Sequence, residues 1–233
     1  PRRTREVADH RIFAQAVVHL LFGRVSELAD EVALAHDADR DAPGQRNPPR
    51  PTALTPVRVD VARHLDFHAF EGCVQPGVVL DTLRAQAEGH KLTFGPDPST
   101  HSRCTLGGMI GNNSCGTHSL LAGKTVDNIH TLRVVLYDGT QLTGGRTADD
   151  ELEAIIRAGG RRGEIYARLK ALRDRYATLI RERYPDIPRR VSGYNLDQLL
   201  PENGFNVAGA LVGTEGTCAV GLEARARHIA SPQ

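Results

Sequence analysis

The sequence lacks the features that would place it in a membrane or on nucleic acid. Its apolar stretch FAQAVVHLLF, residues 13–22, is too short to span a bilayer. The formal net charge of the 233 residues is only +1, which provides no electrostatic basis for binding nucleic acid or a membrane surface. No small-residue cleavage site follows the apolar stretch, so we expect no signal peptide and a cytoplasmic protein.

Metal-binding and nicotinamide-binding patterns are also missing. The four cysteines form no C-x-x-C pair, so we expect reduced thiols, with Cys115 as a packed side chain. His64 and His68 have the spacing of two ligands on a helix, but no third ligand stands near them, so we predict no metal site. No G-x-G-x-x-G links a strand to a helix, which argues against a Rossmann domain.

Glycine, asparagine, serine and threonine are concentrated between residues 93 and 139, in segments such as GPDP and TLGGMIGNNSCG. Glycine lets a ligand approach the backbone closely, and successive amides in glycine turns bind anions. We therefore predict a pocket for a phosphorylated cofactor, with the amides between Pro96 and Gly116 directed at its anionic group. The residue types alone are equally compatible with a connecting loop whose glycines only form turns.

Apolar periodicity and turn residues predict the secondary structure. We expect strands over residues 57–61, 72–75, 92–94, 132–137, 140–143 and 220–229, and helices over residues 1–34, 78–89, 149–158 and 161–184. The pair Asp138-Gly139 predicts a hairpin turn. The apolar face of the helix over residues 161–184 is expected to consist of Ile165, Leu169, Leu172, Tyr176 and Leu179.

Six segments carry a family resemblance, and they are PGVVLDTL, FGPDPST, TLGGMIGNNSCGTHS, GKTVDNI, VVLYDG and VGTEGT. In this order they resemble the PCMH-type FAD-binding domain of the FAD-linked oxidases and dehydrogenases, in the vanillyl-alcohol oxidase superfamily. The D-lactate, glycolate and D-2-hydroxyglutarate dehydrogenases are the most similar group. The resemblance implies an α+β domain with a mixed sheet flanked by helices. It also implies FAD as cofactor and a flavin that accepts hydride from a small 2-hydroxy acid.

The resemblance further implies which residues contact the cofactor. They are Pro96, Asp97, Pro98, Ser99, Leu106, Gly107, Gly108, Met109, Asn112, Asn113, Ser114, Gly116, Gly123, Glu215, Gly216 and Val220. Relatives carry Leu-Gly where this chain has Cys218-Ala219, so the contact near the adenine end departs from the family pattern. Arg189, Arg190 and Tyr194 belong to a segment that lies near the flavin in relatives, and we expect a structural turn there.

We divide the chain into residues 1–56, a helical segment with a Pro-, Arg- and Asp-rich linker, and residues 57–233, the FAD-binding domain. Relatives have an R-G-x-G-T-S loop that residues 1–56 lack, so we expect the first subdomain to be incomplete. In relatives the acid–base residues lie in a C-terminal substrate domain that we expect this chain to lack. The chain would act either alone or with a second subunit. We therefore assign no catalytic residue to this chain.

Two functions remain open from the sequence. The chain is either the FAD-binding module of an oxidoreductase acting on a 2-hydroxy acid, or a non-catalytic remnant or interaction protein. The second kind of protein would keep the fold and bind FAD weakly or not at all.

Overall fold

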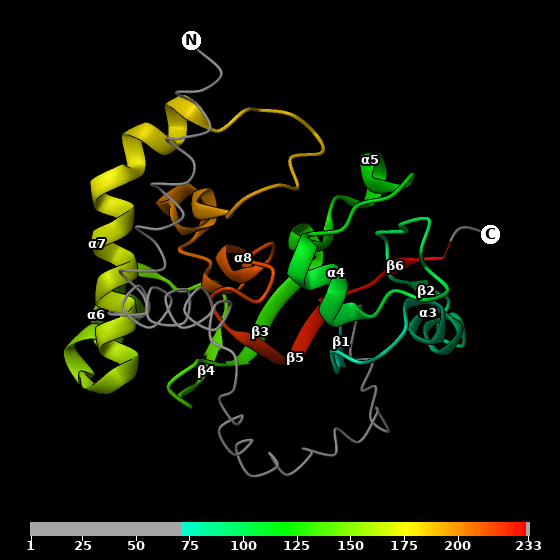
Figure 1. The fold of residues 1–233 in the computed structure, drawn as a ribbon, viewed down its shortest axis with the longest axis horizontal. Coiled ribbons are helices and arrows are strands. Elements are labelled where there is room, and N and C mark those ends of the chain that lie inside the picture. The colour runs from blue at the N-terminus through cyan, green and yellow to red at the C-terminus, as the bar shows by residue number, and fades with distance from the viewer. Residues whose placement is uncertain (1–70, 232–233) are drawn as a thin grey trace, which may run out of the picture.

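A four-stranded antiparallel sheet lies at the centre of residues 71–231, the part of the chain that the computed structural model describes (Figure 1). Its strands, in spatial order, are β1 (Glu71–Val74), β5 (Val220–Arg227), β3 (Ile129–Val135) and β4 (Gln141–Gly144). A second sheet pairs β2 (Leu92–Thr93) with β6 (Ile229–Ala230), also antiparallel. Helices and antiparallel strands together make an α+β fold.

The mixed sheet expected from the sequence is wrong for the described strands, because every pairing among them is antiparallel. The strand β5 comes from the far end of the chain and inserts between β1 and β3. The strand expected over residues 57–61 and the helix expected over residues 1–34 lie outside the described residues.

The hairpin between β3 and β4 forms as Asp138-Gly139 predicts. Gly139 has a φ of +82°, a left-handed conformation that glycine adopts without a steric penalty. The Thr140 amide donates to Asp138 Oδ1 (2.9 Å), and the Leu136 amide donates to the Thr140 carbonyl (2.9 Å). The hydrogen bond from the Thr140 backbone lowers the pKa of Asp138, with smaller contributions from Arg161. Along β3, Ile129, Leu132 and Val134 face the core.

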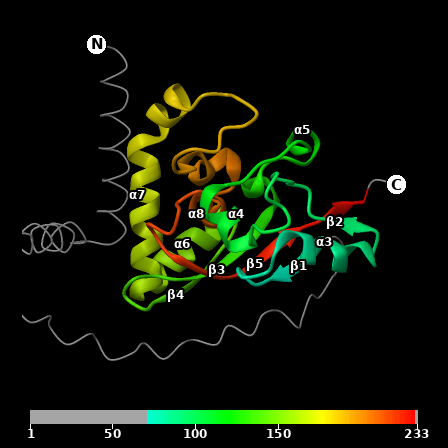
Figure 2. The same ribbon diagram turned by 45° about the vertical axis from the view of Figure 1, so that its right-hand side comes forward.

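Two helices, α6 (Asp149–Ala158) and α7 (Gly160–Arg183), pack together on one side of the sheet (Figures 1 and 2). Three acidic residues in the first turn of α6 complement the helix dipole. The apolar face of α7 was predicted correctly as far as Tyr176, but Leu179 is 40% exposed and Ile180 is 2% exposed. Buried Leu172, half-buried Tyr176 and buried Ile180 are spaced by four residues, so the face continues at Ile180.

The remaining helices are short. They are α3 (Leu80–Glu88), α4 (Leu106–Asn112), α5 (Ser119–Ala122) and α8 (Val207–Leu211), with 3-10 turns η1 (Thr125–Asn128), η2 (Leu196–Leu199) and η3 (Pro201–Asn203). Gly89 caps α3 as predicted but is right-handed, with a φ of −56°. No helix in residues 71–231 is long and apolar enough to cross a bilayer.

The strand expected over residues 220–229 is interrupted at His228, which separates β5 from β6. His228 is 1% exposed, and its ring meets Phe94 edge-on with the ring centroids 6.1 Å apart. Burial disfavours the imidazolium form and lowers the pKa of His228 below its ordinary value of 6.5. The folded protein therefore holds this ring neutral at pH values where an unfolded histidine takes up a proton.

This burial predicts that acid destabilises the fold. Below pH 6.5 the unfolded chain binds a proton at His228 before the folded chain does. We expect the free energy of unfolding, measured by urea titration, to fall as the pH drops from 6.5 through the lowered pKa of the folded state. In His228→Leu this component of the decrease should disappear. An identical pH dependence in both proteins would contradict the prediction.

Candidate functional site

Helix α4, which contains the glycine-rich motif, is anchored to the chain around Pro76. The Leu106 amide donates to the Val78 carbonyl (2.9 Å), and the Gly107 amide donates to the Pro76 carbonyl (2.8 Å). The Gly108 amide donates to Thr105 Oγ1 (3.2 Å), which caps the helix. These three amides are bonded within the protein and are not free to bind an anion, contrary to the role expected for them.

A glycine turn at residues 213–217 is attached to the other end of α4. The Gly213 amide donates to the Ile110 carbonyl (2.9 Å), and the Glu215 amide donates to the Gly111 carbonyl (2.9 Å). Gly213 and Gly216 have φ angles of +86° and +76°, and Glu215 has a φ of +51°. Two motifs about a hundred residues apart in the sequence are therefore hydrogen-bonded to each other.

A cleft of about 260 Å³ opens between α4, this turn and the strands β3 and β5; we call it the α4 cleft. Its lining residues are Pro76, Gly107, Ile110, Gly111, Leu132, Val134, Leu211, Thr214, Gly216, Ala219, Val220, Gly221, Glu223 and Ala224. In both ribbon views α4 lies over β3 and β5 (Figures 1 and 2). Of the sequence-predicted cofactor residues, the cleft brings together Gly107, Gly216 and Val220.

Three glycines leave open space along the α4 cleft. A Cβ atom added at Gly216 or Gly221 would meet no atom within 4 Å, and one added at Gly111 would meet only the Glu215 Cα, at 3.9 Å. Internal packing therefore does not explain these three glycines. The absence of side chains here leaves main-chain atoms accessible to a bound group, as a cofactor cradle requires.

Asn113 contributes a buried polar group at the end of α4. It is fully buried and left-handed, with φ 52° and ψ 48°, a conformation that asparagine tolerates. The Val126 amide donates to Asn113 Oδ1 (3.0 Å), which fixes the orientation of the amide group. The Asn113 Nδ2 atom has no hydrogen-bond partner in the part of the chain that the structure describes. Buried donors are rarely left unpaired, but Asn113 does not line the α4 cleft, so nothing places this atom against a ligand there.

The predicted residues Asp97 and Gly116 form a separate cluster. The Asp97 carboxylate accepts a hydrogen bond from the His118 amide (2.9 Å) through Oδ1. Its Oδ2 atom forms a hydrogen bond with Nδ1 of the His118 ring. A Cβ atom at Gly116 would lie only 2.1 Å from the Asp97 carbonyl oxygen. Within the protein, Gly116 therefore allows two backbone segments to pass each other.

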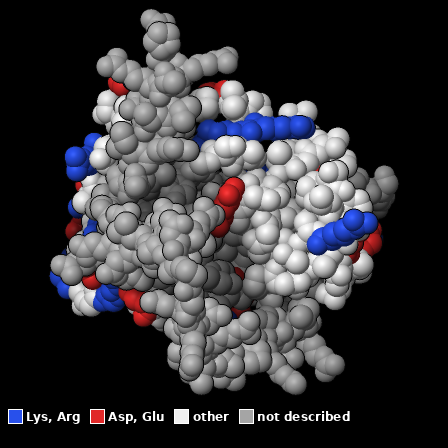
Figure 3. Space-filling view, in the orientation of Figure 1, with Lys and Arg blue, Asp and Glu red and all other residues white. Residues whose placement is uncertain are grey.

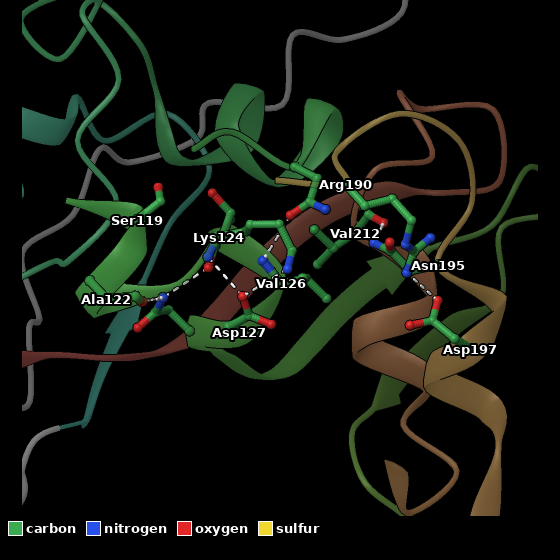
Figure 4. Close-up of polar contacts among 12 residues, drawn as sticks. Ser119, Ala122, Lys124, Val126, Asp127, Arg190, Asn195, Asp197 and Val212 are labelled. Carbon is green, nitrogen blue, oxygen red and sulfur yellow. Dashed lines mark hydrogen bonds and ion pairs between the residues drawn. The ribbon is translucent and has the colours of Figure 1, made fainter. Parts of the chain in front are cut away.

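Gly123 also has an internal role. It has a φ of +73°, and a Cβ atom there would lie 2.7 Å from Asp127 Oδ2. The same carboxylate accepts a hydrogen bond from the Lys124 amide (2.8 Å) and pairs with the Lys124 ammonium group (3.2 Å) (Figure 4). The loop after α5 is thus closed by Asp127, and Gly123 makes room for it.

The remaining predicted residues are divided between core and surface. Pro96, Leu106 and Met109 are buried, and none of them lines the α4 cleft. Ser99, Gly108 and Asn112 are exposed, whereas Pro98 and Ser114 are half-buried, and Ser114 Oγ donates to Asn112 Oδ1 (2.5 Å). Glu215 lies in the turn beside the cleft.

Sequence reasoning missed Gly111, Thr214 and Gly221 as lining residues of the α4 cleft. Gly111 lies inside the glycine-rich motif and Thr214 inside VGTEGT, so position within the motifs was an available signal. Gly221 lies in β5 outside both motifs, and only the fold brings it to the cleft. Cys218, which departs from the family pattern, is 1% exposed, and burial raises the pKa of its thiol.

Comparisons with known proteins identify relatives of this chain. Residues 58–145 match a protein family described as "FAD binding domain". The D-2-hydroxyglutarate dehydrogenase of Pseudomonas putida is 36% identical over 184 residues, which is 76% of this chain and 18% of that protein. The enzyme of the same name from Escherichia coli is 31% identical over 177 residues, covering 72% of this chain and 17% of the relative.

Shorter and more distant similarities were also found. Glycolate oxidase subunit GlcD of Escherichia coli is 39% identical over 77 residues, or 33% of this chain and 15% of the relative. A solved structure of alkyldihydroxyacetonephosphate synthase is 20% identical, with a TM-score of 0.43. The matched region is 73% of this chain and 21% of the synthase chain. The chain spans less than a fifth of the length of the curated relatives named here.

Proposed function

We propose, from the premise that this chain belongs to the family of FAD-linked oxidases and dehydrogenases, that it binds its flavin at the α4 cleft. Its cofactor is FAD. The chain would serve as the FAD-binding module of an oxidoreductase that acts on a 2-hydroxy acid. The two most extensive curated similarities described above are to D-2-hydroxyglutarate dehydrogenases, which supports this substrate class.

One observation carries the proposal. The glycine-rich motif in α4 and the glycine turn at residues 213–217 meet at one cleft, joined by the hydrogen bonds from Gly213 and Glu215. Along that cleft Gly111, Gly216 and Gly221 leave space that no protein side chain fills. The positive φ of Gly216 would also be needed in a turn without a ligand, so Gly111 and Gly221 are the glycines that favour a bound group.

Of the sixteen residues predicted from the sequence, Gly107, Gly216 and Val220 line the proposed site, together with Gly111, Thr214 and Gly221. The other thirteen stay a prediction. The flavin supplies the acceptor for a hydride, and the protein binds and orients it. Gly111, Gly216 and Gly221 would admit the cofactor close to the backbone.

A non-catalytic scaffold is the second candidate, and two observations favour it. The amides of Leu106, Gly107 and Gly108 already donate within the protein, which removes three of the donors expected for a phosphate. The α4 cleft, at about 260 Å³, is smaller than ligand pockets of ordinary size, which start at about 300 Å³. A protein of this kind would keep the fold and bind FAD weakly or not at all.

Titration of the purified full chain with FAD decides between the two candidates. We expect the thermal unfolding temperature to rise with FAD concentration, because a ligand that binds only the folded state stabilises it by about 2.7 kcal/mol at 100 times its Kd. The flavin fluorescence should change over the same concentration range. Adenosine, which lacks both the flavin and the diphosphate, is the matched ligand control. An unfolding temperature that does not change at any FAD concentration would favour the scaffold.

A further inference from the structure

A second and larger cavity, of about 580 Å³, lies beside the α4 cleft and shares Thr214 with it. The chain from the end of α7 to Tyr194 forms one wall, and the turn at residues 213–217 forms the other. We call it the arginine cavity. The lining residues that matter here are Arg183, Tyr184, Arg189, Arg190, Tyr194 and Thr217.

Two tyrosines stabilise the arginine cavity, Tyr184 within one wall and Tyr194 between the two walls. The Tyr184 hydroxyl donates to the Tyr194 carbonyl (2.8 Å), and the Tyr194 hydroxyl forms a hydrogen bond with Thr217 Oγ1 (2.7 Å). Burial raises the pKa of Tyr184 to about 12, so this donor keeps its proton at physiological pH. The loop after α7 is therefore tied to the glycine turn before any ligand arrives, which reduces the entropy lost on binding.

Arg190, in the same wall as the two tyrosines, is held by two contacts. Its guanidinium group forms an ion pair with Asp197 (2.6 Å; Figure 4). The same group lies over the ring of Tyr184, 4.5 Å from the centroid. Nearby, Asn195 Nδ2 donates to the Val212 carbonyl (2.7 Å), which joins the same two walls. The charge of Arg190 is thus compensated by Asp197.

Arg183 and Arg189 differ from Arg190 in having no acidic partner among residues 71–231. Both are exposed and line the cavity. The acidic residue that lines it is Glu215, so Arg183 and Arg189 together leave the cavity with a net positive charge. In Figure 3 basic side chains cross the upper middle of this face of the molecule, where Figure 1 shows the loop after α7.

We propose that the arginine cavity binds the carboxylate of a small organic acid through Arg183 and Arg189. A planar guanidinium group binds a carboxylate through two parallel hydrogen bonds. Apolar parts of the acid would contact Ile187 and Tyr194, which also line the cavity. The choice of a carboxylic acid rests on the proposed function, since Thr214 places this cavity next to the cleft assigned to the flavin.

Calorimetric titration of the full chain with glutarate, carried out without FAD, tests this inference. Glutarate has two carboxylates and no hydroxyl group that could be oxidised, and glutaramide is its neutral counterpart. We expect glutarate to bind and glutaramide not to bind. In the double variant Arg183→Gln, Arg189→Gln, binding of glutarate should be about tenfold weaker, with each single variant intermediate.

Arg157→Gln is the matched control, because Arg157 is an exposed arginine at the end of α6 that lines none of the three cavities. It removes the same charge and should leave glutarate binding unchanged. Thermal unfolding of each variant verifies that the fold is kept. Equal losses in control and double variant, a preference for inorganic phosphate, or no binding of glutarate would each overturn the inference.

The outcome is separable from that of the FAD titration. Glutarate binding by a chain that does not bind FAD would support the arginine cavity and refute the proposed cofactor site. FAD binding without glutarate binding would support the proposed cofactor site and refute the arginine cavity as a carboxylate site.

Discussion

Gly116→Ala should lower the free energy of unfolding by about 3 kcal/mol, as expected for overpacking in a closely packed region. The new Cβ atom would lie 2.1 Å from the Asp97 carbonyl oxygen and 2.2 Å from the carbonyl carbon. Both atoms belong to the backbone, so no side-chain rotation relieves the contact. Because Asp97 also accepts the hydrogen bond from the His118 amide, its displacement would loosen the loop before α5. Urea unfolding measures the change.

Gly77→Ala is the control for this substitution. A Cβ atom at Gly77 would meet no atom within 4 Å, so the same added methyl group should change the free energy of unfolding by less than about 0.5 kcal/mol. Equal stability of Gly116→Ala and Gly77→Ala would show that the loop around Asp97 moves freely and would contradict the prediction.

Gly111→Leu should weaken FAD binding about a hundredfold, equivalent to about 2.7 kcal/mol. Gly111 lines the α4 cleft, and a Cβ atom added there would make only an ordinary contact, 3.9 Å from the Glu215 Cα. The leucine side chain would therefore occupy the space proposed for the cofactor. The fold should not suffer, because leucine favours a helix interior over glycine by nearly 1 kcal/mol.

Two measurements on the Gly111→Leu protein separate blockage from unfolding. Its thermal unfolding without FAD should match or exceed that of the unchanged chain, while the FAD titration shows the loss of affinity. Gly89→Leu, at the exposed end of α3 and outside the cleft, should bind FAD normally. If Gly111→Leu bound FAD as tightly as Gly89→Leu, the cofactor would have to lie elsewhere.

Local patterns in the sequence were sufficient for most of the secondary structure. Helix α6 has the predicted bounds, Asp149–Ala158, because acidic residues mark its start and a glycine follows its end. The hairpin at Asp138-Gly139 also depends on neighbouring residues alone. The face of α7 was predicted less well, since Leu179 and Ile180 are both apolar and only the packed structure selects Ile180.

Features that depend on residues far apart in the chain could not be predicted in this way. Nothing in the sequence around Val220 shows that β5 inserts between β1 and β3, and so Gly221 was not recognised at the cleft. The sequence also shows a glycine at position 107 without showing what its amide bonds to. The partner is the Pro76 carbonyl, thirty-one positions earlier, and that contact exists only in the folded chain.

The insertion of β5 between β1 and β3 determines when the fold can form during synthesis. Ribosomes release the chain from its N-terminus, so β1 and β3 emerge well before β5 and cannot be joined until it follows. Until then both strands present unpaired edges, which readily pair with other chains. Newly made molecules therefore pass through an interval of vulnerability to aggregation, and it ends only when Val220–Arg227 has left the exit tunnel.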